Sequence, residues 1–222
     1  MKGGPNLCVG IYNDRLMHPK YTPNSTKMHI HTIGDSHSMF GWRNIPGVIV
    51  HHIGPKLAFS VGRDGLTVSP EYGIQAGDTV VFSFGEIDCR CHIHKHVTPE
   101  TSYKEIIDPI VTAYIGRILE LSATLPGVRC CIYNVVPPVQ RHKSAENKQY
   151  PFLGSDEERR SYTLYFNTTL ATACAAHGLT FIDVYDAYAT PEKYLNRAHS
   201  DGHVHIRDAC YIIDFVRTHL SA

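Results

Sequence analysis

Side chains that could together perform nucleophilic catalysis lie near the two ends of the sequence. The segment GDSHS, residues 34 to 38, places Ser36 between an acid and a histidine, and the segment SDGHVHIRDA, residues 200 to 209, supplies Asp201, His203 and His205. A serine hydroxyl is a weak nucleophile until a base takes its proton, and an imidazole base works best when a carboxylate fixes its tautomer. These residue types indicate acyl transfer. On the GDS motif alone, the alternative that Asp35 or Ser36 only caps a helix stays open.

Five short β-rich runs alternate with helical patterns, which is typical of a parallel sheet covered on both faces. The runs are MHIHTI (28 to 33), VIVHHI (48 to 53), TVVFSF (79 to 84), VRCCIYNVV (128 to 136) and LTFIDV (179 to 184). Ligands of such sheets bind outside the carboxyl ends of the strands. GDSHS follows the first run, so the hydroxyl of Ser36 and an unsatisfied backbone N–H are expected at a cleft.

Three helices are expected. The first covers about 106 to 119, the second follows Ser155 and reaches about 177, and the third covers 207 to 219. In the first, Asp108-Pro109 could instead be the N-cap and first turn, or a kink. Ser155 and Glu158 form a capping box at the start of the second, and Gly178 fits its end.

Composition narrows the possible classes of protein. At 222 residues and 43% hydrophobic content, the chain is long enough for one buried α/β core. We predict an irregular leader over residues 1 to 27 and a single domain over 28 to 222. Lys+Arg and Asp+Glu both number 21, so no net basic field favours nucleic acid or an anionic membrane. The sequence has no apolar stretch of the roughly 20 residues that a span requires and no secretion signal, so we expect a cytoplasmic location.

A competing chemistry is suggested by CRCHIHKH, residues 89 to 96, which holds two cysteines and three histidines. Thiolates and imidazoles at such spacing could bind zinc. The segment lacks the separated second pair of ligands that structural zinc sites usually have, which favours a simple loop after the third strand. We therefore expect no metal and no cofactor.

Taken in order, four motifs resemble those of the SGNH hydrolases, also called GDSL-like esterases and lipases. They are GDS (34 to 36), HHIGP (51 to 55), FGEIDCR (84 to 90) and DGHVHIRDA (201 to 209). The resemblance implies a three-layer α/β/α sandwich with a five-stranded parallel sheet in the flavodoxin-like order. It also implies a catalytic set of Ser36, His205 and Asp201, with oxyanion or substrate-binding positions at Gly54, Asp35, Asp88 and Arg90.

The base is expected to be His205, because Ile206 to Ala209 resembles the sequence that follows the family's catalytic histidine. The family's motif is Asp-x-x-His, so this chain carries one extra residue, which a tight turn at Gly202 could absorb. A second departure is Ile87, which stands where the family has an asparagine that donates to the oxyanion. Losing one such donor can cost about 3 kcal/mol. Arg90, His92 and Asn134 are candidate replacements.

The expected activity is hydrolysis of small O-acyl esters, acetate foremost, on a carbohydrate or small molecule. The GEIDCR form resembles a branch of the superfamily associated with microbial and viral surface-polysaccharide genes. Two alternatives stay open: transfer of the acyl group to a sugar, and a catalytically silent carbohydrate-binding or assembly module. Nucleic-acid and membrane partners are not expected.

Overall fold

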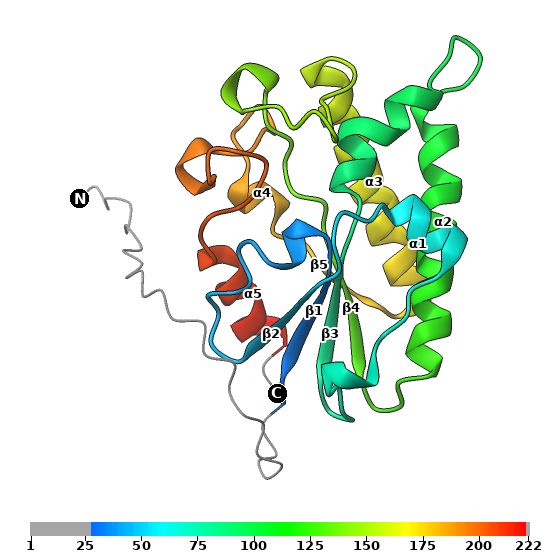
Figure 1. Cartoon of the computed structure of the whole chain (residues 1–222), viewed down its shortest axis with the longest axis vertical. Helices are drawn as coiled ribbons and strands as arrows, with labels where there is room; N and C mark the ends of the chain where they lie inside the picture. Colours follow the sequence, from blue (N-terminus) through cyan, green and yellow to red (C-terminus); the bar gives the residue numbers. More distant parts are fainter. Residues whose placement is uncertain (1–27, 221–222) are drawn as a thin grey trace.

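The computed structural model describes residues 28 to 220, so the predicted leader over 1 to 27 lies outside the described residues. Five parallel strands form one sheet in the order β2-β1-β3-β4-β5 (Figure 1). This confirms the five predicted strands and their flavodoxin-like order. The strands are β1 Ile30–Gly34, β2 Val48–His52, β3 Thr79–Ser83, β4 Arg129–Tyr133 and β5 Thr180–Ile182.

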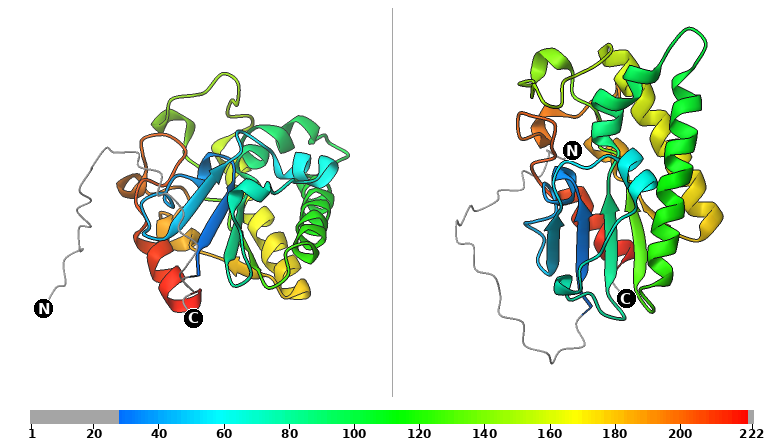
Figure 2. Two further views of the ribbon diagram at one scale, coloured as in Figure 1. Left: turned by 60° about the horizontal axis from the view of Figure 1, so that its bottom comes forward. Right: turned by 45° about the vertical axis from the view of Figure 1, so that its right-hand side comes forward.

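Helices cover both faces of the sheet, as the views in Figures 1 and 2 show. The helices α1 Ala58–Asp64, α2 Tyr103–Ala123 and α3 Asp156–His177 pack side by side and share one apolar core with the sheet. The helices α4 Tyr185–Tyr188 and α5 Cys210–His219 contribute to a second core that also contains Val81 and Ile182. Two cores separated by one sheet make the three-layer sandwich that was predicted.

Short helical turns occupy several of the connections. One is a π-helical turn, Asp88–His92, and the others are 3₁₀ turns: Ser36–Ser38, Pro70–Tyr72, Ile93–His96, Arg141–Lys143 and Arg197–His199.

Two helices begin a few residues from the predicted positions, and in each case a hydrogen bond fixes the backbone at the start. In α2, the Ser102 side chain accepts from the Glu105 backbone in a capping box, so the helix begins before Asp108 and Pro109 lies inside it. The Asp108 carboxylate instead accepts a hydrogen bond from Tyr165 of α3, at 2.9 Å. In α5, the helix begins at Cys210 because the N–H of Arg207 donates to the His199 carbonyl, at 2.7 Å.

The start and end of α3 confirm the prediction. Ser155 and Glu158 form the capping box, and Gly178 ends the helix in the left-handed conformation with φ 68°. Within residues 28 to 220, none of the helices combines the length and the apolar character that a membrane span requires.

The carboxyl ends of the strands meet at the edge of the sheet where the sequence motifs lie (Figure 1). Gly34, the last residue of β1, pairs with Ser83 of β3. A Cβ atom on Gly34 would lie 2.1 Å from the Ser83 carbonyl oxygen, so a side chain cannot be accommodated there. The glycine of GDSHS therefore lets β1 approach β3 closely just before Ser36.

Candidate active site

Ser36 begins a single 3₁₀ turn, Ser36–Ser38, that directly follows β1. Two hydrogen bonds to Asp35 fix the turn. The Asp35 carboxylate accepts from the His37 N–H at 2.8 Å, and the Ser38 hydroxyl donates to the Asp35 carbonyl at 2.8 Å. Asp35 is thus the cap of this turn, and capping leaves the Ser36 hydroxyl free for another partner.

That partner is His205. Its Nε2 lies 2.9 Å from the Ser36 Oγ, and its Nδ1 lies 2.8 Å from the Asp201 Oδ2. The backbone N–H of His203 also donates to Asp201, at 2.8 Å, whereas the His203 side chain is exposed. The extra residue of the motif falls in a turn where Gly202 has φ 90°. The structure brings the three residues of the expected catalytic set into one hydrogen-bonded chain.

The protonation states of His205 and Asp201 suit a general base at neutral pH. Burial, together with the neighbouring His37, lowers the pKa of His205 to about 4. Burial would raise the pKa of Asp201, but hydrogen bonds from the His205 ring and the His203 backbone bring it below its ordinary value. Near pH 7, His205 is neutral and Asp201 is ionised, which is the pairing that proton abstraction from a serine requires.

Two backbone N–H groups follow the ends of the neighbouring strands β1 and β2. Gly54 follows β2 with φ 85°, and a Cβ atom placed on it would meet nothing within 4 Å. Within the described part of the chain, the N–H groups of Ser36 and Gly54 donate to no protein acceptor. Unsatisfied N–H groups at the end of a strand and the start of a turn can stabilise an oxyanion.

Two acids that were predicted to contact the substrate, Asp35 and Asp88, are buried in the structure. The side chains of Asp35 and Asp88 are fully buried, with 0% residue exposure. The Asp88 carboxylate accepts from the N–H groups of Ala58 and Phe59, at 2.7 and 3.0 Å, and so holds the start of α1. Burial raises the pKa of Asp88 to about 7 in spite of these hydrogen bonds. Both carboxylates are buried and accept hydrogen bonds from backbone N–H groups, so their predicted role in binding substrate is not supported.

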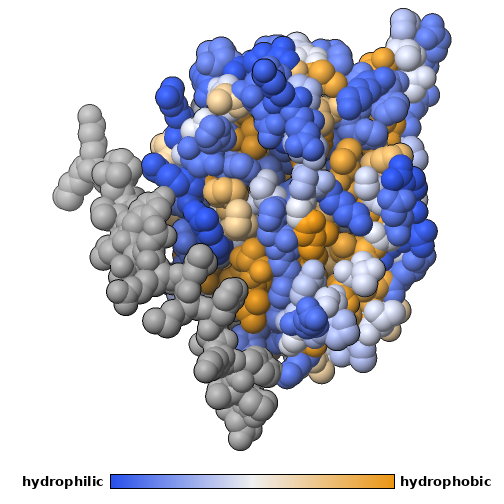
Figure 3. All heavy atoms as spheres, in the orientation of Figure 1, coloured by the Kyte–Doolittle hydropathy of each residue, from blue (hydrophilic) through white to orange (hydrophobic). Residues whose placement is uncertain are grey.

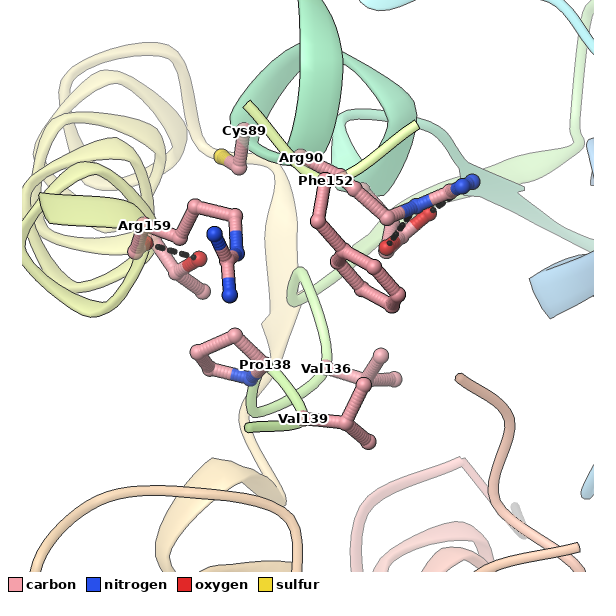
Figure 4. Close-up of a pocket in the computed structure, with 9 residues that line it drawn as sticks. Cys89, Arg90, Val136, Pro138, Val139, Phe152 and Arg159 are labelled. Carbon is pink, nitrogen blue, oxygen red and sulfur yellow. Dashed lines mark hydrogen bonds and ion pairs between the residues drawn. The ribbon is translucent and has the colours of Figure 1, made fainter. Parts of the chain in front are cut away.

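Arg90 is also held by the protein. Its guanidinium donates to both carboxylate oxygens of Glu86, at 2.7 and 3.0 Å, and to the Tyr150 carbonyl. In Figure 4, the ring of Phe152 lies between Arg90 and Arg159, and each guanidinium lies within 6 Å of that ring's centre. Because Arg90 is bound on several sides, its predicted role in binding substrate is not supported.

The other proposed substitutes for the family asparagine are occupied too. The Asn134 side chain donates to the Val135 carbonyl at 2.8 Å and accepts from the Val184 N–H at 2.9 Å. The ring of His92 packs 4.7 Å from that of Phe59 in α1. Ile87 itself is buried, with 3% exposure. Of the expected oxyanion donors, the backbone N–H groups of Ser36 and Gly54 are the ones without a protein acceptor in the described residues.

Residues near the base include two that were not singled out from the sequence. The ring of Phe40 stacks on His205, with ring centres 4.1 Å apart and planes at 17°. The ring of His37 lies 4.9 Å from that of His205. Both belong to the segment that follows the nucleophile, but only the folded chain shows that they face a residue near the C-terminus.

The segment CRCHIHKH forms a π-helical turn and a 3₁₀ turn instead of the loop that was expected. Burial raises the pKa of the Cys89 thiol well above its ordinary value, which disfavours the thiolate that a metal requires. Among residues 28 to 220, the one cluster of metal-ligating atoms is formed by His199, Asp208 and Cys210, outside this segment. In that cluster, Asp208 already bonds the His199 ring and the Cys210 thiol, at 2.9 and 2.8 Å.

No family model and no curated protein matches the sequence. Among solved structures, a protein from Streptococcus pneumonia assigned as a platelet activating factor superimposes with a TM-score of 0.59 and 15% identity, covering 90% of this chain and 86% of that one. A protein from Bacteroides fragilis assigned as an acylhydrolase gives 0.57 and 14%, covering 89% and 88%. A GDSL-like lipase from Bacteroides thetaiotaomicron gives 0.54 and 14%, covering 85% and 84%. These likenesses show a shared fold.

Proposed function

The chain has the SGNH hydrolase fold, and we propose that it is a serine esterase that hydrolyses small O-acyl esters, acetate foremost, on a carbohydrate. The observation that carries the proposal is the hydrogen-bonded chain from Ser36 through His205 to Asp201 at the carboxyl end of the sheet. The N–H groups of Ser36 and of Gly54, which follows the neighbouring strand, have no protein acceptor in the described residues.

The geometry supports a two-step reaction. The Ser36 Oγ attacks the ester carbonyl while its proton moves to the His205 Nε2, and the N–H groups of Ser36 and Gly54 hold the oxyanion. His205 then gives that proton to the departing alcohol, which leaves an acyl group on Ser36. Water attacks the acyl-enzyme with His205 again as base, and the free acid leaves. Asp201 stabilises the imidazolium in both steps.

The surface supports a small acyl group. A long acyl chain needs an extended apolar surface. Among residues 28 to 220, the large hydrophobic side chains classed as exposed are Met28 and Tyr211. Figure 3 shows mostly hydrophilic residues over the loops at the top of the molecule, which lie above the strand ends in Figure 1. A short acyl group such as acetate does not need an apolar groove.

A pocket that reaches the loop carrying Asp201 supports a carbohydrate as the alcohol. It has a volume of about 430 Å³ and reaches Ser200 and Gly202, the neighbours of Asp201 in sequence. Its other lining residues include side chains that donate and accept hydrogen bonds, among them Gln140, Thr190 and Asn196. Several hydrogen-bonding side chains in one cleft are suited to the hydroxyl groups of a sugar.

Labelling with an activated phosphonate probe tests the serine mechanism directly. We expect one probe molecule to bind each protein molecule, and peptide mass spectrometry to find it on Ser36. A catalytically silent binding module would stay unlabelled under conditions in which a known serine esterase reacts fully.

The pH dependence should reflect the low pKa of the base. A base whose pKa is lowered stays neutral, and active, above that pKa and is protonated only below it. With the pKa of His205 at about 4, we expect kcat/KM for a soluble acetate ester to stay level from about pH 8 to about pH 5 and to fall tenfold per pH unit well below pH 4. Initial rates in buffers of constant ionic strength measure this profile. A fall that begins near pH 7 would contradict the described environment of His205.

A further inference from the structure

His37 lies between two acceptors. Its Nδ1 is 3.2 Å from the Asp35 Oδ1, and its Nε2 is 3.2 Å from the Val204 carbonyl oxygen. Neither a carboxylate in an ion pair nor a backbone carbonyl has a proton to give, so each ring nitrogen must carry its own proton to make both bonds. The ring is buried, with 4% exposure, so water cannot replace either bond easily. Both contacts are hydrogen bonds only if the ring is an imidazolium.

These two bonds connect the segments that carry the nucleophile and the base. Asp35 directly precedes Ser36, and Val204 directly precedes His205, although 167 residues separate His37 from Val204. The loop from 200 to 206 is closed at its base by a backbone bridge between Ser200 and Ile206. The His37 contact adds a point of attachment at the position next to the base.

The charges around His37 favour the cation. Burial alone would lower the pKa of His37, but the adjacent Asp35 carboxylate and then the Glu86 carboxylate bring it above the ordinary value. Glu86 comes from the turn after β3 and is itself paired with Arg90. On the remaining side, the ring faces His205 at 4.9 Å. Two carboxylates and one neutral imidazole thus surround the ring.

We propose that His37 is a positioning residue that acts as a buried cation, holding the backbone beside His205 to the acid beside Ser36. The link fixes the separation between the His205 Nε2 and the Ser36 Oγ, which is 2.9 Å. The positive charge also opposes protonation of the neighbouring base, because like charges at such a distance repel. The proposal rests on the proposed esterase function.

The test compares His37→Gln with His203→Gln. Glutamine is uncharged, and its two N–H donors share one nitrogen, so it cannot reproduce one bond from each of the two ring nitrogens. Because small displacements of reacting groups are costly, we expect His37→Gln to lower kcat by about 10- to 100-fold and to change KM by less than about threefold. Without the neighbouring cation, the acid limb of the pH profile should move up by about one unit. His203→Gln, in an exposed side chain of the same loop, should leave kcat and the profile unchanged.

A nitrogen-15 NMR spectrum of the histidine rings in the unaltered protein provides a second measurement, which holds even if His37→Gln fails to fold. The proposal expects the two ring nitrogens of His37 to be protonated at pH 7, with the signal assigned by its loss in a His37 variant or by its contacts to His205. A neutral tautomer of His37 at pH 7 would overturn it, as would a His37→Gln enzyme with unchanged kcat and an unchanged acid limb. If the unaltered protein shows no turnover at all, the esterase function fails, and the NMR result still decides whether the cationic link exists.

Discussion

Replacing Ser36 with alanine is expected to lower kcat for an aryl acetate by about 10⁴-fold or more, because removing the nucleophile disables the whole catalytic set. The Ser36 Oγ contacts His205 at 2.9 Å, and the residue is partly exposed, so its loss leaves no buried polar group without a partner. We therefore expect the free energy of unfolding to change by less than about 0.5 kcal/mol. Initial rates and urea denaturation of both proteins measure the two quantities.

Ser38→Ala is the matched control, since it removes a serine hydroxyl from the same turn. The Ser38 Oγ is buried and donates to the Asp35 carbonyl at 2.8 Å. Its loss should destabilise the protein by about 1 kcal/mol and keep kcat within about tenfold of the original. Equal turnover by Ser36→Ala and the unaltered protein would show that Ser36 is not the nucleophile.

His205→Ala should lower kcat by several orders of magnitude, because the Ser36 proton then has no acceptor. His203→Ala should have a much smaller effect. The His203 side chain is exposed, and its contact with Asp201 is made by the backbone N–H, which alanine retains. The pair of variants distinguishes two histidines that lie two residues apart in one loop, and rates with the same aryl acetate compare them.

The opposite result would require a different base. If His203→Ala were inactive and His205→Ala kept near-normal rates, the loop would have to rearrange so that His203 reached Ser36. Circular dichroism of both variants is the control for folding. His205 also stacks on Phe40, so a small change in stability is expected for His205→Ala alone.

The sequence by itself determined the features that depend on residues close together along the chain. The alternation of strands and helices follows from local periodicity, and the capping box at Ser155 and Glu158 needs only a spacing of three. The choice of His205 over His203 came from the motif that follows it, and the structure places His205, not His203, against Ser36. The glycine at position 202 accommodates the extra residue with a positive φ.

Tertiary contacts decided what the same residue types do once they are buried. Asp35 and Asp88 are acids in motifs, but whether a carboxylate faces a ligand or a backbone N–H depends on segments far away in the chain, such as the start of α1. The Arg90 guanidinium likewise donates to the Glu86 carboxylate and the Tyr150 carbonyl, so it is held within the protein.

The role proposed for His37 depends on such contacts most clearly. Nothing in GDSHS shows that the histidine meets the Val204 carbonyl, because that contact exists only after β1 and the loop before α5 come together. Sequence patterns report periodicity and spacing over a few residues. The protonation and partners of a buried side chain are set by the charges and acceptors that folding brings around it, and these come from the whole length of the chain.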